Sequence, residues 1–219
     1  MADAQSQQLC TLPHELRSTL RAALLSRGIS ALTPVQTRTL QPAREARDLS
    51  VCSPTGSGKT LAYVLPLADA HLARRDGDGG DATAADVSVL VLLPTRELAA
   101  QVHAAAAFVT QAAGVRAVLC AGGAPLALHE AALRDADAPP HWVVGTPGRL
   151  KDLADRGVLR LHALRTQVCT RVRACILCPS ETTRRLRLRR SWTRRTACWT
   201  RALATRRWRC CARPARRKR

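Results

Sequence analysis

The residues with the clearest chemical potential are Gly56-Ser57-Gly58-Lys59-Thr60, which stand between a short apolar stretch and a segment with helical periodicity. Glycines allow backbone N–H groups to close around phosphate oxygens, and the start of a helix adds positive potential at the same place. A lysine at this spacing reaches the β- and γ-phosphates of a nucleotide, and the hydroxyl that follows it coordinates Mg²⁺. The pattern therefore predicts a nucleotide phosphate site centred on Lys59 and Thr60.

The predicted nucleotide-binding segment begins at the end of the apolar stretch. It comprises Ser53, Pro54, Thr55, Gly56, Ser57, Gly58, Lys59 and Thr60. The strict form of this pattern has glycine at position 53, where this chain has serine. Taken alone, the segment indicates a phosphate-binding ATPase, GTPase or kinase and does not separate them.

Four further segments narrow the choice. They are residues 28–36, which end in Thr33-Pro34-Val35-Gln36; Pro94-Thr95-Arg96-Glu97-Leu98; Gly122-Gly123; and Thr146-Pro147-Gly148-Arg149-Leu150. In order and spacing they resemble the Q motif, motif Ia, the GG element and motif Ib of the DEAD-box ATP-dependent RNA helicases. The resemblance covers about residues 12–167. It disfavours another ATPase or kinase with the same phosphate loop.

The resemblance implies ATP and Mg²⁺ as ligands, with Thr60 on the metal and the carboxamide of Gln36 reading the edge of adenine. It also implies binding of the RNA sugar-phosphate backbone without sequence specificity. The residues implied in RNA binding are Pro94, Thr95, Arg96, Glu97, Gly122, Gly123, Thr146, Pro147, Gly148 and Arg149. Arg96 and Arg149 either meet phosphates or brace the loops. The family also places an aromatic residue near position 11, whereas the first aromatic here is Tyr63, so we expect weaker stacking on adenine.

The elements that must position these residues follow from periodicity. We predict strands at 48–52, 87–93, 115–120 and 142–144, and helices at 12–27, after Pro34, at 61–73, up to 112, at 125–134 and from 146 onwards. An exposed loop is expected at 74–86. Strand, loop and helix alternate, which predicts an α/β RecA-like domain with a parallel sheet. Ligands of such sheets bind at the carboxyl edge, where every segment named above is expected.

Charge divides the chain into two parts. The formal net charge is +19, yet residues 1–159 hold 15 Lys and Arg against 15 Asp and Glu. The whole excess therefore lies in residues 160–219, where Glu181 is the one acid. We accordingly divide the chain into an N-terminal extension (1–11), a helicase ATP-binding domain (12–167) and an Arg-rich tail (168–219).

The sequence contains no Asp-Glu-Ala-Asp run, the acidic motif that the family uses to hold Mg²⁺ and place the attacking water. The codons allowed at Trp192-Thr193 and Trp199-Thr200 fit that motif in a shifted reading frame. We therefore expect the tail to be intron-derived or out of frame, and disordered, leaving an incomplete sheet whose strands expose unpaired edges. For this chain we expect ATP and RNA binding without unwinding.

An alternative function comes from the tail itself. Arginines interspersed with Trp192, Trp199 and Trp208 are typical of a non-catalytic RNA-binding segment. The final Arg216-Arg217-Lys218-Arg219 is also typical of a nuclear or nucleolar address. We expect an intracellular protein in the nucleus, nucleolus or cytoplasm, with no membrane partner and no oligomer.

Overall fold

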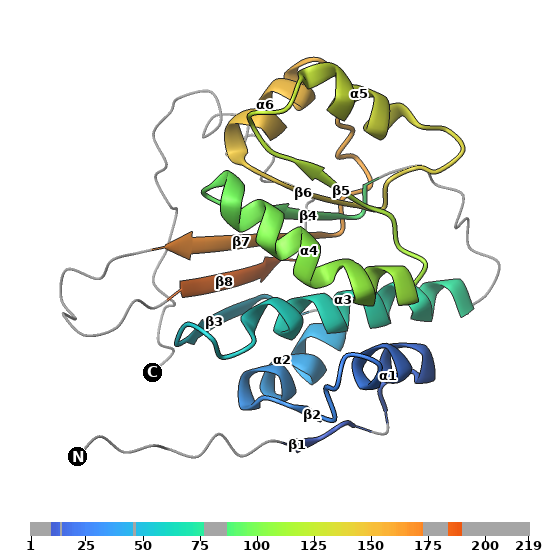
Figure 1. Cartoon of the computed structure of the whole chain (residues 1–219), viewed down its shortest axis with the longest axis vertical. Coiled ribbons are helices and arrows are strands. Elements are labelled where there is room, and N and C mark those ends of the chain that lie inside the picture. The colour runs from blue at the N-terminus through green and yellow to red at the C-terminus, as the bar shows by residue number, and fades with distance from the viewer. Residues whose placement is uncertain (1–9, 14, 46, 77–86, 173–183, 190–219) are drawn as a thin grey trace, which may run out of the picture.

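The computed structural model of the chain describes residues 10–13, 15–45, 47–76, 87–172 and 184–189. Its main sheet has the strand order β3-β8-β7-β4-β6-β5 (Figure 1). The strands are β3 (Leu49–Ser53), β4 (Val89–Leu92), β5 (Ala117–Cys120), β6 (Trp142–Gly145), β7 (Thr166–Val172) and β8 (Arg184–Arg189). A small antiparallel ribbon joins β1 (Cys10–Thr11) to β2 (Ala31–Leu32), and strands this short leave no periodicity to predict.

Strand direction decides where the loops emerge. β4 pairs in parallel with β6 and β7, and β5 pairs in parallel with β6. β8 runs antiparallel to both of its neighbours, so β3 on its far side points the same way as β7. The carboxyl ends of β3, β4, β5, β6 and β7 therefore share one edge, and the predicted α/β fold with a parallel sheet is confirmed.

The prediction of a disordered tail with unpaired strand edges is wrong for the tail residues that the structure describes. β7 pairs with β4 in a register that sets Val168 beside Val91, and β8 fills the position between β3 and β7. Both segments alternate in the sequence, with a β-branched residue at every second position of 166–172 and leucine between arginines in 184–189. That period of two is typical of strands. The other tail residues, 173–183 and 190–219, lie outside the described residues, as do positions 1–9.

The helices largely follow the predicted ranges. They are α1 (Ser18–Leu25), α2 (Pro34–Arg44), α3 (Lys59–Asp76), α4 (Arg96–Ala112), α5 (Leu126–Arg134) and α6 (Pro147–Asp155). α1 begins later than predicted, because the chain first makes a turn in which the Leu16 N–H donates to the Pro13 carbonyl at 3.1 Å. α3 extends into the predicted loop at 74–86, whose remaining positions 77–86 are not described. None of the described helices is both long and apolar enough to cross a membrane.

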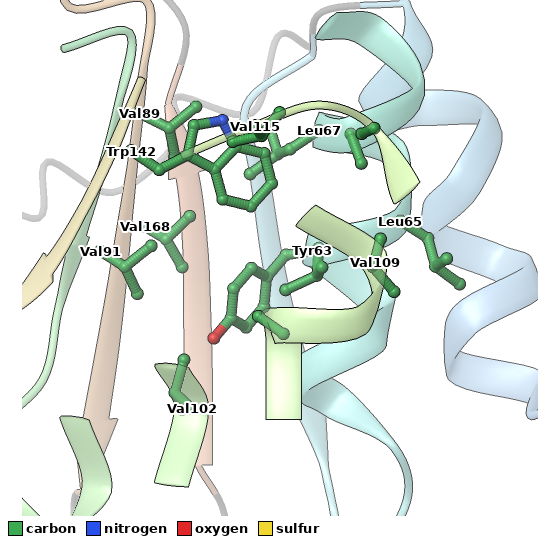
Figure 2. Close-up of a cluster of buried hydrophobic side chains, with 14 of the residues drawn as sticks. Tyr63, Leu65, Leu67, Val89, Val91, Val102, Val109, Val115, Trp142 and Val168 are labelled. Atoms are coloured by element: carbon green, nitrogen blue, oxygen red, sulfur yellow. The ribbon is translucent and has the colours of Figure 1, made fainter. Parts of the chain in front are cut away.

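The two faces of the sheet bury different side chains of the same strand. Val89 and Val91 of β4 pack in one apolar cluster with residues of α3 and α4, and Figure 2 shows this cluster around Tyr63 and Trp142. Leu90 and Leu92 pack in a second cluster with residues of α6. β4 is thus buried on both faces, as its unbroken apolar run predicted. In Figure 1, α1, α2 and α3 gather toward β3, and α5 and α6 gather toward β5.

Candidate functional site

The nucleotide loop leaves β3 with the backbone conformation of a phosphate-binding turn. Gly56 and Gly58 have φ of 82° and 85°, in the left-handed region that glycine enters without strain. The buried Ser57 ties the loop together, because its Oγ donates to the Pro54 carbonyl at 2.9 Å and lies 2.8 Å from Ser53 Oγ. α3 begins directly after the loop at Lys59. The loop N–H groups and the helix start therefore lie together, as an anion site requires.

Lys59 lies over this loop. Its Nζ donates to the Ser53 carbonyl at 2.8 Å and to the Pro54 carbonyl, and lies 3.4 Å from Ser57 Oγ. All these partners are neutral, whereas phosphate oxygens are charged and accept stronger hydrogen bonds from an ammonium group. The ammonium is thus placed where a phosphate in the loop would compete with the carbonyls for it.

Gln36 connects α2 to the nucleotide loop. Its side chain is buried, its Oε1 accepts from the Thr33 N–H at 2.9 Å, and its Nε2 donates to the Gly58 carbonyl at 3.1 Å. Thr33 Oγ1 donates to the Ser57 carbonyl at 2.9 Å. A carboxamide has two N–H bonds and two lone pairs, so these two contacts use one donor and one acceptor of Gln36 and leave one of each.

Thr33 is a residue of this site that the sequence analysis did not assign. The available signal was the spacing Thr-x-x-Gln, which is typical of a helix capping box. Tyr63, the first aromatic of the chain, is 2% exposed and belongs to the core beside the sheet, so its ring does not face the loop.

The hydroxyl that follows Lys59 lies at the start of α3. Thr60 is the second residue of α3, half-buried, and is the hydroxyl that would hold Mg²⁺ beside the phosphates. Across the described ranges, no group of three or more His, Cys, Asp or Glu side chains is arranged to hold a metal. Thr55 and Pro54 are exposed at the tip of the loop.

The loop after β4 gives α4 its start. Thr95 is the N-cap residue, and its Oγ1 accepts from the Leu98 N–H at 3.3 Å. The pKa of the Glu97 carboxyl is lowered chiefly by its own backbone N–H and then by the Thr95 hydroxyl. Pro94 is exposed at the beginning of the turn. The segment thus presents a helix N-terminus at the carboxyl edge.

Arg96 joins this segment to the glycine pair after β5. A Cβ added at Gly122 would lie 3.1 Å from Arg96 Nε, and one at Gly123 would lie 3.0 Å from Arg96 Nη1. The Arg96 guanidinium therefore packs against both glycines, and a side chain added at either position would require it to shift. Gly123 also has a φ of 101°, which other residues rarely adopt.

The segment after β6 is tied to the same turn. The Thr146 N–H donates to the Cys120 carbonyl at 3.2 Å, and Pro147 begins α6. Arg149 Nη1 donates to the Ala124 carbonyl at 2.9 Å and lies 2.5 Å from Nδ1 of the buried His129. Arg149 therefore braces the turn in this structure, one of the two roles expected for it.

The environment of this turn is apolar enough to shift ionisable groups. Burial raises the pKa of the Cys120 thiol to about 12, against the opposing charge of Arg149. Burial, followed by the charge of Arg149, lowers the pKa of His129. His129 is the second residue that the sequence analysis missed, since nothing in its local sequence links it to Arg149.

The comparisons with known proteins identify the family of this chain. The family model of the DEAD/DEAH box helicases matches residues 33–177, well over half of the chain. DEAD-box ATP-dependent RNA helicase 7 of Oryza sativa subsp. japonica is 40% identical over 158 residues, which are 70% of this chain and 22% of that protein. The chain thus spans about a fifth of the length of this curated relative.

Two solved structures share the fold. A hypothetical ATP-dependent RNA helicase from Sulfolobus tokodaii is 28% identical with a TM-score of 0.58, over 70% of this chain and 40% of that one. Mss116p bound to ssRNA and AMP-PNP is 25% identical with a TM-score of 0.61, over 70% of this chain and 30% of that one. With its nucleotide loop and glycine-braced edge in the order that the sequence predicted, this chain belongs to the DEAD/DEAH box helicase family.

Proposed function

We propose that this chain binds ATP at residues 53–60 and reads adenine through Gln36. The observation that supports this most is the bond from the Gln36 carboxamide to the Gly58 carbonyl, because it sets a base-reading amide directly against the phosphate loop. Lys59 would then meet the β- and γ-phosphates, and Thr60 would hold Mg²⁺, which supplies charge neutralisation when bound.

The second part of the proposal is that the carboxyl edge binds the sugar-phosphate backbone of single-stranded RNA. Arg96 and Arg149 bring the segments after β4, β5 and β6 together, and helix N-termini at Thr95 and Thr146 offer N–H groups to phosphates. The structure of Mss116p with ssRNA and AMP-PNP supports assigning both ligands to this type of domain.

For a whole protein that contains such a domain, we propose RNA-stimulated ATP hydrolysis and RNA duplex unwinding. The relative from Oryza sativa is named as an ATP-dependent RNA helicase, which supports this proposal. For this chain we propose binding without turnover, because the sequence has no Asp-Glu-Ala-Asp run to support Mg²⁺ and the attacking water.

The nucleotide proposal is tested by titrating the full chain with fluorescent ATP and GTP analogues in the presence of Mg²⁺. A site that reads the adenine edge should prefer ATP by about tenfold or more, since the wrong base leaves polar groups of the site unpaired. Equal affinity for the two nucleotides would contradict the role given to Gln36. Phosphate release above background on addition of RNA would contradict binding without turnover.

The RNA proposal requires that the edge be separated from the basic tail. Removing residues 168–219 is unsuitable, because it deletes most of β7 and all of β8 from the sheet. Replacing the Lys and Arg residues of 206–219 with glutamine keeps both strands. Labelled decauridylate and decacytidylate should still bind this variant with affinities within about twofold of each other if backbone contacts dominate. Complete loss of binding would instead favour the tail as the RNA-binding segment.

A further inference from the structure

The contact between Arg149 and His129 connects α6 to α5 beneath the glycine turn. Arg149 Nη1 lies 2.9 Å from the Ala124 carbonyl oxygen and 2.5 Å from His129 Nδ1. A guanidinium Nη carries two N–H bonds, so the same nitrogen donates one to each acceptor. This one nitrogen of α6 therefore links Ala124, which follows the Gly122–Gly123 turn, to His129 of α5.

The chemistry of the pair determines the state of the imidazole. Arginine stays protonated in proteins and has no acceptor, so His129 Nδ1 must supply the lone pair, and the ring proton lies on Nε2. A doubly protonated ring would direct an N–H at the N–H of Arg149, beside a full positive charge. The contact therefore exists only while His129 is neutral.

The surroundings of His129 favour the neutral form. The imidazole is buried, with the residue 7% exposed, and Arg149 is the cation that acts on it from α6. The neighbouring carboxylate on α5, Glu130, lies 3.6 Å from the Arg156 guanidinium at the end of α6. Cys120 of β5 is a neutral thiol, because burial raises its pKa to about 12.

We propose that His129 is a positioning residue for RNA binding, because its Nδ1 lone pair orients Arg149 to hold the Gly122–Gly123 turn against α6. Protonation of His129 releases that hold. The inference rests on the proposed function of the carboxyl edge, and it adds a dependence on proton concentration that the arginines of the edge do not themselves have.

The direction of the effect follows from the shift. The pKa of a histidine in an unfolded chain is about 6.5, and in the folded chain the pKa of His129 is lower. The contact between His129 and Arg149 is therefore fully present when the pH is above the unfolded-chain pKa. It is lost as the pH falls through the lowered pKa of His129 in the folded chain. RNA affinity should decrease over the same interval below neutrality.

The test compares His129→Gln with His129→Leu in the full chain, using labelled decauridylate. Gln offers an uncharged acceptor at every pH, whereas Leu leaves the Arg149 N–H without one. At pH 7.5 we expect H129Q to bind within about twofold of the wild type and H129L to bind about fivefold more weakly, as for a lost buried hydrogen bond. Between pH 7.5 and 5, the wild type should weaken more than H129Q. His162→Gln, which removes an exposed histidine, serves as the control and should follow the wild type.

A second measurement does not involve RNA. Hydrogen exchange at the amides of residues 122–124 should be faster in H129L than in the wild type and unchanged in H129Q. If H129Q loses as much affinity as H129L, or if its pH profile matches that of the wild type, the positioning role is overturned. Unchanged exchange in H129L also overturns it. If no variant binds RNA while exchange responds as expected, the proposed function fails and the positioning of the turn stands.

Discussion

The nucleotide loop and the carboxyl edge of the sheet are held in place by different kinds of interaction, one neutral and one charged. The loop is tied to α2 by neutral groups, the Gln36 carboxamide and the Thr33 hydroxyl, which donate to loop carbonyls. The edge is tied together by two guanidinium groups, Arg96 along the glycines and Arg149 on the Ala124 carbonyl.

The two regions also differ in whether their positively charged side chains are available to bind a ligand. Lys59 is the cation of the loop and donates to the Ser53 and Pro54 carbonyls, and a phosphate in the loop would compete with these carbonyls for it. Arg149 already donates to the Ala124 carbonyl and to His129 Nδ1, so part of its hydrogen-bonding capacity is committed within the edge. Substitutions in the loop should therefore lower mainly the affinity for a ligand. Substitutions in the edge should lower mainly the stability of the packing that holds the edge together.

The largest effect is expected from Gly145→Ala, at the framework of the edge. A Cβ there would overlap the Cys120 carbonyl oxygen, so β5 and β6 must separate. We expect the free energy of unfolding to fall by about 3 kcal/mol, as for severe overpacking. Urea denaturation measures it. Gly148→Ala is the matched control, because nothing lies within 4 Å of the added carbon; similar losses for both would contradict the close approach.

Next in size is Lys59→Ala, which removes the cation of the loop. The affinity for a fluorescent ATP analogue should fall about thirtyfold, close to the ~2 kcal/mol of a charge-assisted hydrogen bond. RNA affinity should stay unchanged, since Lys59 belongs to the other region. The control is Lys151→Ala, whose ammonium pairs with Asp155 on the surface of α6. Equal loss of ATP binding in the two variants would show only a general charge effect.

Gln36→Glu should produce a smaller loss. The new carboxylate still accepts from the Thr33 N–H, but it has no N–H to donate to the Gly58 carbonyl. Its second oxygen would instead repel the Gly58 carbonyl oxygen. We expect ATP affinity to fall about fivefold, with a reduced preference over GTP. Isothermal titration with both nucleotides gives the two values. Gln101→Glu, an exposed position on α4, adds the same charge elsewhere and should leave both unchanged.

The smallest expected effect distinguishes the two roles open to Arg96. If the side chain meets an RNA phosphate, Arg96→Gln should lower the slope of log affinity against log salt by about one. If it only braces Gly122 and Gly123, affinity should fall about twofold to threefold with the slope unchanged. Fluorescence anisotropy over a salt series decides between them, with the exposed Arg134→Gln of α5 as the control.

The parts of the fold and site that the sequence predicted are those with local signals. The β-branched and leucine run at 87–93 fits a doubly buried strand, and Gly56 to Thr60 indicate a tight turn before a helix, because both signals depend on neighbouring residues. The strands β7 and β8 were missed because the residues from 168 onwards were expected to be intron-derived or out of frame and disordered, so the period of two in these segments was not used. Strand pairing joins residues far apart in sequence, as Val91 and Val168 are, and no local pattern specifies it.

The sequence by itself indicated a phosphate-binding loop, because a lysine, a hydroxyl and two glycines stand at fixed spacing, and it indicated the family, because four further segments follow in the family's order. Only the tertiary structure decided that Arg149 donates to a histidine 20 residues away in the chain and that the Arg96 guanidinium packs against two glycines. Such contacts form because paired parallel strands bring the helices and turns that follow them close together. Which strands are paired is decided only in the folded sheet.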